Sequence, residues 1–230
     1  MLETRAIAEE LMDADDLAPE TYAKVLTDLA KVNTVTMARR PTLDFLSRVR
    51  AAAPGKPLKI LDVGFGDGDM LRAISRWGKT HGAKLTLVGI DLNPKSASIA
   101  GAATPDDMRI EYLTGDYASL ADQDFDVILS SIVAHHMSHD QLIGFLRFMD
   151  GQARRGWFIN DLHRHGFAWA GFPLLARLMG WHYIVRHDGQ LSIARSYRPS
   201  EWPPLLREAG VSDAHVFRAF PFRLCVQTIR

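Results

Sequence analysis

The sequence predicts a doubly wound α/β fold in one domain, and three observations support it. A glycine-rich turn follows an apolar run near residue 64. From residue 58 to about residue 161, short apolar runs alternate with segments of helical period, which is typical of parallel strands joined by helices. Two more apolar runs close the chain and predict an antiparallel hairpin. Together these runs predict a seven-stranded sheet.

The glycine-rich turn is the most informative stretch of the chain. The segment Lys59–Gly68 begins with an apolar run, reaches an acid at Asp62, and then carries three glycines at every second position. This order predicts a buried strand that enters a turn lying close to a ligand. A helical period follows, and its apolar face holds Met70, Leu71, Ile74 and Trp77. Strand, turn and helix together predict a crossover of the nucleotide-binding type.

The central segment, residues 56–162, is expected to contain all the parallel strands. The strand candidates are Leu58–Val63, Lys84–Asp91, Met108–Leu113, Phe125–Ser131 and Gly156–Asp161. Most are continuous apolar runs, as expected for a sheet covered on both faces. Helices are expected between them at about 67–81, 94–101 and 138–150. Asn93 is a helix cap by type, and Ser138 with Gln141 forms a capping-box pattern. Such sheets bind ligands at the carboxyl ends of their strands.

Residues 1–55 predict an N-terminal helical cover. Its three expected helices span residues 2–13, a segment that begins at Pro19, and residues 41–53. They precede the first strand, so they are an addition to the nucleotide-binding unit. A plain structural role for their residues remains an alternative.

Residues 163–198 interrupt the alternation of strands and helices. The segment is rich in aromatic residues and histidines and is too long for a simple connection. We expect an inserted substrate lid with one helix over about 167–179. Residues 199–230 then predict a last helix, capped by Ser200 and ended by Gly210, and a hairpin of Ala214–Ala219 and Phe222–Ile229.

Composition restricts the partners and the location of the protein. Lys plus Arg and Asp plus Glu both number 27, so no net charge would attract nucleic acid or an anionic membrane. The single cysteine, Cys225, excludes an internal disulfide and is expected to be a buried core residue. No signal-like N-terminus is present, and no window approaches the roughly 20 apolar residues of a membrane span. We therefore expect a cytoplasmic protein without nucleic-acid or membrane partners.

The glycine spacing separates two kinds of nucleotide site. In the dinucleotide fingerprint two residues separate the second and third glycines, whereas here only Asp67 stands between Gly66 and Gly68. Asp67 and Asp69 also lie where a pyrophosphate would approach the helix N-terminus, which disfavours an anionic ligand. A ligand with a cationic centre fits this turn better.

At this point the chain resembles the class I S-adenosylmethionine-dependent methyltransferases, which have a Rossmann-like fold. The segment from Asp62 through Gly64, Phe65 and Gly66 to Gly68 fills that family's D/E-x-G-x-G-x-G motif. The resemblance runs from about residue 56 to the end of the chain. It implies that S-adenosylmethionine is the cofactor and that these five residues bind it.

Three further positions match the family in order along the chain. Asp91, followed by Leu92, stands at the family's position for the acid that holds both ribose hydroxyls. Asp116 and Tyr117 stand where the family places an acid facing the adenine amino group. Ser130 and Ser131 end the motif of the fourth strand, below the methionine moiety. The resemblance assigns all six residues to the cofactor site.

The residues after the fourth and fifth strands exclude several subclasses of this family. No N/D/S-P-P-Y/F motif follows Ser130, as in methyltransferases of nucleic-acid amino groups, and no Pro-Cys nucleophile is present. Asn160-Asp161 has the reverse order of the Asp-Asn pair in metal-dependent catechol-type enzymes. We therefore expect no metal and no nucleic-acid substrate. The chain looks closest to stand-alone methyltransferases of small phenolic and polyketide-derived metabolites.

Histidines are the candidate bases for removing a hydroxyl proton. His136 and His163, each beyond the carboxyl end of a central strand, are the leading candidates. His135 is expected to share the site with His136, and Asp161 to orient an imidazole. A purely structural role for each histidine remains open. The predicted function is methyl transfer to a hydroxyl of a small aromatic molecule.

Three alternatives accompany this prediction. One is methylation of carbon or nitrogen in a quinone-like molecule, which needs the same flat apolar pocket and base. Another is a non-catalytic protein that binds the cofactor or acts as a pathway scaffold. A nicotinamide oxidoreductase is disfavoured by the glycine spacing. The oligomeric state is not predicted.

Overall fold

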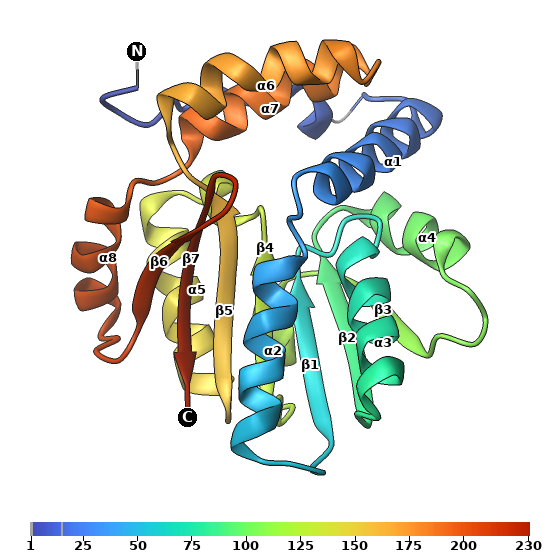
Figure 1. The fold of residues 1–230 in the computed structure, drawn as a ribbon, viewed down its shortest axis with the longest axis vertical. Helices are drawn as coiled ribbons and strands as arrows, with labels where there is room; N and C mark the ends of the chain where they lie inside the picture. The colour runs from blue at the N-terminus through green and yellow to red at the C-terminus, as the bar shows by residue number, and fades with distance from the viewer. Residues whose placement is uncertain (1, 15) are drawn as a thin grey trace.

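The structure, a computed structural model, describes residues 2–14 and 16–230. Within these residues, seven strands form one sheet in the order β3-β2-β1-β4-β5-β7-β6 (Figure 1). The strands are β1 (Leu58–Val63), β2 (Leu85–Asp91), β3 (Ile110–Thr114), β4 (Val127–Ser131), β5 (Gly156–Leu162), β6 (His215–Ala219) and β7 (Arg223–Ile229). The first five are parallel, and β7 pairs antiparallel with both β5 and β6. The predicted fold class is confirmed.

Helices cover both faces of the sheet because side chains alternate between its faces along each strand. On one face, α5 (His139–Gln152) and α8 (Trp202–Ala209) pack over Leu61, Ile128 and Trp157. On the other, α2 (Arg40–Ala52), α3 (Asp69–His81) and α4 (Pro94–Ala103) pack over Ile60, Val127 and Phe158. The core therefore lies in two layers, one on each side of the sheet.

Three helices lie beyond the carboxyl ends of the parallel strands. They are α1 (Pro19–Val35), α6 (Gly166–Leu178) and α7 (Tyr183–Arg195), and Figure 1 shows α6 and α7 lying across that end of the sheet with α1 beside them. A separate apolar cluster joins them, in which Val25 and Val32 of α1 pack with Ala176 of α6 and Val185 of α7. These helices combine parts of the N-terminal cover and of the insertion.

The capping patterns of the core helices are confirmed. Asn93 accepts a hydrogen bond from the Lys95 N–H at 3.0 Å and begins α4. Ser138 and Gln141 form a reciprocal capping box at the start of α5. Gly210 ends α8 with a φ of 81°, a left-handed conformation that favours glycine. Local signals are sufficient at these three ends because the cap itself satisfies the first or last backbone groups of the helix.

The predicted helix over residues 2–13 is wrong. Only Leu11–Asp13 form a single 3₁₀ turn, and residues 2–10 have no helical structure. Backbone groups of this segment bond to α7 instead: the Leu11 and Met12 N–H groups each donate to the Asp188 carboxylate at 2.9 Å. These long-range contacts override the helical spacing of the sequence, which is a weak signal by itself.

Two predictions about later segments also need correction. The insertion contains two helices, α6 and α7, where the sequence predicts one over about 167–179. Ser200 does not cap the last helix, because a 3₁₀ turn over Pro199–Glu201 precedes α8, which begins at Trp202. Among the described residues, no helix is both long and apolar enough to cross a membrane.

Candidate active site

A cavity of about 440 Å³ lies at the carboxyl ends of the parallel strands. On the sheet side it is lined by the glycine turn and by residues that follow β2, β3 and β4. On the opposite side it is lined by α1, with Tyr22, Leu26 and Asn33, and by α7, with Val185 and Ser192. We call it the strand-end cavity. The cavity thus lies between the sheet and helices α1 and α7.

The glycine turn brings backbone to the cavity wall. Gly64, Gly66 and Gly68 have φ angles of 76°, 58° and 77°, a conformation that glycine adopts without strain. A side chain at Gly64 would overlap Val133. The Gly66 N–H donates to Asp91 Oδ2 at 2.9 Å and so joins the turn after β1 to the end of β2. The backbone conformation favours glycine at all three positions, and at Gly64 and Gly68 a Cβ would also overlap a neighbouring side chain.

Asp91 has the orientation expected of a ligand-binding carboxylate. It ends β2 and lines the strand-end cavity. Its Oδ2 accepts from Gly66, and its Oδ1 accepts from the Asn93 N–H at 2.8 Å. Two backbone donors therefore hold the carboxylate in place. Its role toward ribose hydroxyls stays a prediction.

Most of the predicted cofactor-binding residues meet at this cavity. Those that line it are Asp62, Gly64, Phe65, Gly66, Asp91, Leu92, Tyr117 and Ser131. Gly68 and Ser130 do not line it. Gly68 is the N-cap residue of α3, and the buried Ser130 hydroxyl donates to the Val63 carbonyl at 3.2 Å. These two residues support the turn and the strand end from behind the wall.

Asp116 lies apart from the other predicted cofactor-binding residues. Asp116 is exposed and lies outside the cavity lining, and its side chain accepts from the Ala118 N–H at 2.8 Å. It caps the 3₁₀ turn Tyr117–Leu120. Its neighbours Gly115 and Tyr117 line the cavity instead. The expected contact of Asp116 with an adenine amino group therefore has no support in this geometry.

Carboxylates make the glycine-turn end of the cavity negative. Burial, together with the charges of Asp69 and Asp91, raises the pKa of Asp62 well above its ordinary value. Asp69 is paired with Arg39 at 2.8 Å, whereas none of the ion pairs in the described part of the chain includes Asp62. A ligand cation beside Asp62 would favour its charged form. This end of the cavity therefore fits a cation better than a phosphate.

His136 is the predicted base that lines the strand-end cavity. Its side chain is 29% exposed, and its Nε2 lies 3.8 Å from Oε2 of the buried Glu10. Burial alone would raise the pKa of Glu10, but hydrogen bonding with His135, the charges of both histidines and the Ser192 hydroxyl lower it. The Ser192 Oγ donates to Glu10 Oε1 at 2.8 Å. A carboxylate is thus held beside the imidazole of His136.

His135 and Asp161 form a buried pair behind His136. His135 Nδ1 lies 2.7 Å from Asp161 Oδ1, and its Nε2 lies 3.6 Å from Glu10 Oε1. Burial alone would lower the pKa of His135, but the charge and hydrogen bond of Asp161, with Glu10, raise it to about 9. Neither residue lines the cavity. His135 is thus an imidazolium between two carboxylates, and Asp161 orients this imidazole rather than that of His136.

His163 lies away from the strand-end cavity. Its N–H donates to the Phe222 carbonyl at 2.9 Å, and it forms an isolated β-bridge with Tyr197. Burial, with the charge of His165 and nearby arginines, lowers the pKa of His163. It lines neither this cavity nor the apolar one described below. Its ring lies 5.3 Å from the ring of His165 and outside both cavities, so the structure does not support His163 as a base.

Glu10 and the two adjacent histidines bring possible metal-ligand atoms close together. In the described residues, ligand atoms of Glu10, His135 and His136 lie within 4.8 Å of one another. A metal ion bound there would have to displace the proton of His135, because a metal ligand must be a neutral imidazole. The absence of a catalytic metal stays a prediction.

A second cavity of about 240 Å³ adjoins the first. We call it the apolar cavity, because its wall is mostly formed by Leu29, Val32, Ile132, Leu162, Phe167, Phe172, Leu175, Ile193, Pro221 and Phe222. Leu29, Asn33, Ile132, Gly189 and Ser192 line both cavities. Ile132 has a φ of 60°, a strained conformation for a β-branched residue. A flat apolar molecule in this space would lie next to a ligand in the strand-end cavity.

Comparison with known proteins supports this view of the site. Residues 60–155 match the family described as "Methyltransferase domain". The chain contains a methyltransferase domain. The match covers β1 to the end of α5 and includes the glycine turn, Asp91 and the histidine pair. The predicted class I methyltransferase is confirmed at the level of domain and fold.

Two curated relatives share the methyltransferase domain and part of its surroundings. Both are named ubiquinone biosynthesis O-methyltransferase. The protein from Bartonella quintana is 29% identical over 69% of this chain and 62% of its own length. The protein from Parvibaculum lavamentivorans is 28% identical over 76% of this chain and 65% of its own length. The chain thus spans slightly less than two thirds of each relative.

Solved structures show the same fold at low sequence identity. The plantazolicin methyltransferase BpumL, in complex with a pentazolic desmethylPZN analogue and SAH, has a TM-score of 0.67 and 16% identity over 91% of this chain and 90% of its own. Human N-acetylserotonin methyltransferase in complex with SAM has a TM-score of 0.65 and 16% identity over 98% of this chain and 60% of its own. In both comparisons the similar region extends well beyond residues 60–155, the part of this chain that matches the methyltransferase domain.

Several lining residues lie outside the methyltransferase domain and were not predicted as site residues. Glu10 comes from the N-terminal segment, Tyr22 and Asn33 from α1, and Asp188 and Ser192 from α7. Glu10 is part of a predicted helix stripe in the sequence, where an acid on the apolar side is the only signal. The other four carry no local signal, because their role depends on how the outer helices pack on the domain.

Proposed function

We propose that the protein transfers a methyl group from S-adenosylmethionine to a hydroxyl oxygen of a small aromatic molecule of the phenolic or polyketide type. The observation that carries the proposal is that the apolar cavity adjoins the strand-end cavity where His136 and Glu10 lie. The names of the two curated relatives support O-methylation. The aromatic wall supports a ring-shaped acceptor.

The residues of the strand-end cavity fit S-adenosylmethionine, which supplies a methyl group on a positively charged sulfur. Asp91 would accept hydrogen bonds from the ribose hydroxyls, and Asp62 would face the ammonium group. A buried acid with a raised pKa and no cationic partner among the described residues is consistent with a cationic ligand. The three glycines allow the backbone to lie against the ligand.

His136 is the proposed general base. A phenol has a pKa of about 10 and is largely protonated at neutral pH, whereas an imidazole with a pKa near 6.5 can accept its proton. The nearby Glu10 carboxylate would stabilise the imidazolium that forms. His135, Asp161 and Ser192 are then positioning residues. Asp161 holds the imidazole of His135, and the Ser192 hydroxyl donates to Glu10.

Replacing His136 tests the proposal. We expect His136→Gln to lower kcat for a phenolic acceptor by roughly 10²- to 10⁴-fold, the usual contribution of a general base, with little change in affinity for S-adenosylhomocysteine. Product formation by mass spectrometry and calorimetry measure the two quantities. His163→Gln is the matched control and should retain most of the activity. Equal loss in both variants, or full activity of His136→Gln, would contradict the assignment.

Methylation of carbon or nitrogen in a quinone-like molecule is a second candidate. The relatives' names place them in ubiquinone biosynthesis, and the same apolar cavity accepts a quinone-like ring. Fragmentation of the product separates the two. A methyl group that is lost as methanol or a methyl radical from oxygen supports the main proposal, and a methyl group retained on ring carbon supports the alternative.

A further inference from the structure

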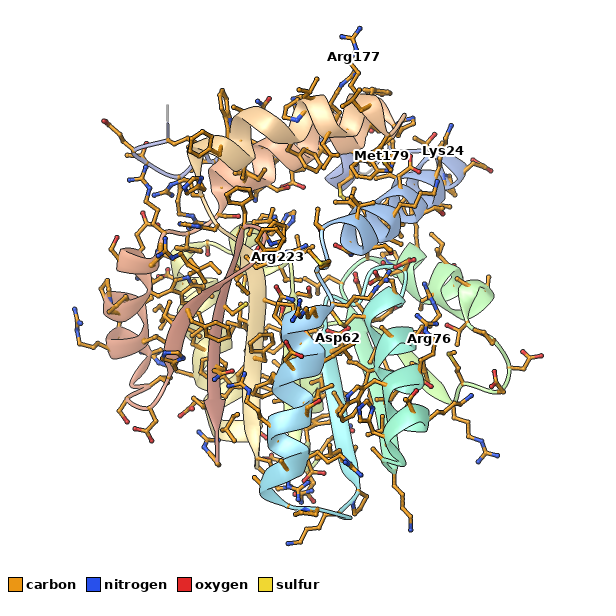
Figure 2. All side chains as sticks on the ribbon, in the orientation of Figure 1. Lys24, Asp62, Arg76, Arg177, Met179 and Arg223 are labelled. Atoms are coloured by element: carbon orange, nitrogen blue, oxygen red, sulfur yellow. The ribbon has the colours of Figure 1, made fainter. Side chains whose placement is uncertain are left out.

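Arg223 is a buried guanidinium in the wall of the apolar cavity. It is the first residue of β7, is 2% exposed and lines the cavity together with aromatic side chains. Figure 2 shows it at the lid end of the sheet, below α6 and α7. An arginine stays protonated even when burial lowers its pKa, as it does here. A positive charge therefore faces an otherwise apolar space.

This charge is poorly satisfied within the protein. Arg223 Nη1 has no hydrogen-bond partner in residues 2–14 and 16–230, and Nη2 has only a long contact of 3.4 Å to Asn33 Oδ1. None of the ion pairs between described residues includes Arg223. A buried, unpaired charge costs several kcal/mol as an order of magnitude, so its retention calls for an external partner.

The nearest carboxylates are already used elsewhere. Asp161 is bonded to His135 at 2.7 Å, and Asp69 is paired with Arg39 at 2.8 Å. Asn33 contacts both Asp69 and Arg223: its Nδ2 donates to Asp69 at 3.3 Å, and its Oδ1 accepts from Arg223. Neither acid forms an ion pair with Arg223. No described carboxylate of the protein therefore neutralises Arg223.

We propose that Arg223 binds a carboxylate carried by the methyl acceptor, so that the substrate class is an aromatic hydroxy acid. This inference rests on the proposed function. A guanidinium presents its donors in a planar fork that matches a carboxylate. Among the described residues that line the cavity, the other polar ones are Asn33, Thr36 and Ser192, and all three are uncharged, so Arg223 carries the only full charge of this lining.

The arrangement also orients the acceptor. Arg223 lines only the apolar cavity, whereas Ile132 and Ser192 line both cavities. A ring whose carboxylate lies at Arg223 would extend between the aromatic side chains toward this shared boundary. Its hydroxyl would then face the strand-end cavity and His136. Arg223 thereby serves as a specificity-determining residue, at the end of the acceptor opposite to the reacting oxygen.

The first test compares matched acceptors on the unaltered protein. Hydroxybenzoates and dihydroxybenzoates are compared with their methyl esters and with the corresponding phenyl phosphates, by product mass spectrometry. We expect kcat/KM to be roughly 10- to 100-fold higher for the acids than for the esters, the scale of one charge-assisted hydrogen bond. Equal values for acid and ester overturn the inference, and a preference for the phosphates replaces the carboxylate with another oxyanion.

The second test uses variants and does not depend on turnover. Binding of the same acids and esters to the protein with S-adenosylhomocysteine is measured by calorimetry for Arg223→Gln, Arg223→Lys and the control Arg218→Gln, an exposed arginine of the same hairpin. We expect Arg223→Gln to lose at least tenfold in affinity for the acids, Arg223→Lys to recover part of it, and Arg218→Gln to match the unaltered protein.

Two results would give Arg223 a different role. A loss of S-adenosylhomocysteine affinity in Arg223→Gln would show that it binds the cofactor's own carboxylate. A lower unfolding temperature with the acid preference retained would show a structural role.

If no acceptor is methylated but acids bind in an Arg223-dependent manner, the proposed function fails and the carboxylate site stands. If no acid binds, the carboxylate site fails.

Discussion

Four aspartates near the strand-end cavity differ in their roles, and the surroundings of each one determine its role. Asp62 is buried, has a raised pKa and forms no ion pair with another described residue. Asp69 is paired with Arg39, and Asp91 is held by two backbone N–H groups. Asp116, at a similar position beyond its strand, points into solvent as a cap. The residue type is the same in all four cases, and burial and partners decide which of them can meet a ligand.

Asp91 and Asp116 provide a matched comparison. We expect Asp91→Ala to weaken S-adenosylhomocysteine binding by about 1.5–3 kcal/mol, since a charge-assisted hydrogen bond is lost. Asp116→Ala should change the affinity by less than about 0.5 kcal/mol, because its side chain lies outside the strand-end cavity. Titration calorimetry measures both. A larger effect at Asp116 than at Asp91 would restore the adenine contact that the sequence predicts and the structure does not support.

At the scale of elements, the packing of α6 on α7 shapes the apolar cavity. Gly189 of α7 faces Phe172 of α6, and a Cβ at Gly189 would overlap the phenylalanine ring. Both residues line the apolar cavity. The close approach of the two helices at this point therefore depends on a glycine, although glycine lowers helix propensity.

Substituting Gly189 distinguishes the cost of side-chain overlap from the gain in helix propensity. We expect Gly189→Ala to lower the free energy of unfolding by about 1–3 kcal/mol, the usual cost of overpacking. Gly144→Ala in α5, where nothing lies within 4 Å of the added Cβ, should raise it by up to about 1 kcal/mol. Denaturant unfolding measures both changes. Equal stabilisation of the two variants would show that α6 and α7 are free to move apart.

The outer elements also mark the limit of sequence-based prediction. The helical spacing in residues 2–13 is overridden by the hydrogen bonds that the Leu11 and Met12 N–H groups donate to Asp188, across 177 and 176 positions of the chain. Helix α7 is missed because its sequence has almost no apolar periodicity. The core strands and the caps of the core helices are predicted well, because an apolar run and a helix cap are each determined by a few consecutive residues.

At the scale of the whole molecule, the buried pair of His135 and Asp161 connects β5, the segment after β4, and Glu10 of the N-terminal segment. The pKa of His135 rises from its ordinary value of 6.5 to about 9 on folding. A raised pKa means that the folded state binds this proton more tightly than the unfolded state. The resulting stabilisation is fully present below pH 6.5 and is lost as the pH rises through about 9.

We therefore expect the free energy of unfolding to fall between about pH 6.5 and pH 9. His135→Gln should lose this dependence and be less stable throughout, because Glu10 and Asp161 are left without the imidazolium. His139→Gln, which removes an exposed histidine paired with Glu208, should keep the dependence. Chemical unfolding across this pH range provides the measurement. A flat profile in the unaltered protein would contradict a charged His135.

The sequence by itself determined the fold class, the domain type and most of the strand-end residues that line the strand-end cavity. Glycines at Gly64 and Gly66 and an acid at Asp91 are required by backbone conformation and by a turn, and such requirements are legible in a few consecutive residues. Tertiary structure alone decided which histidine faces the cavity, that Glu10 lies beside it, and that the buried Arg223 forms no ion pair with any described residue. The physical reason is that charge and burial at these residues depend on contacts between segments far apart in the chain.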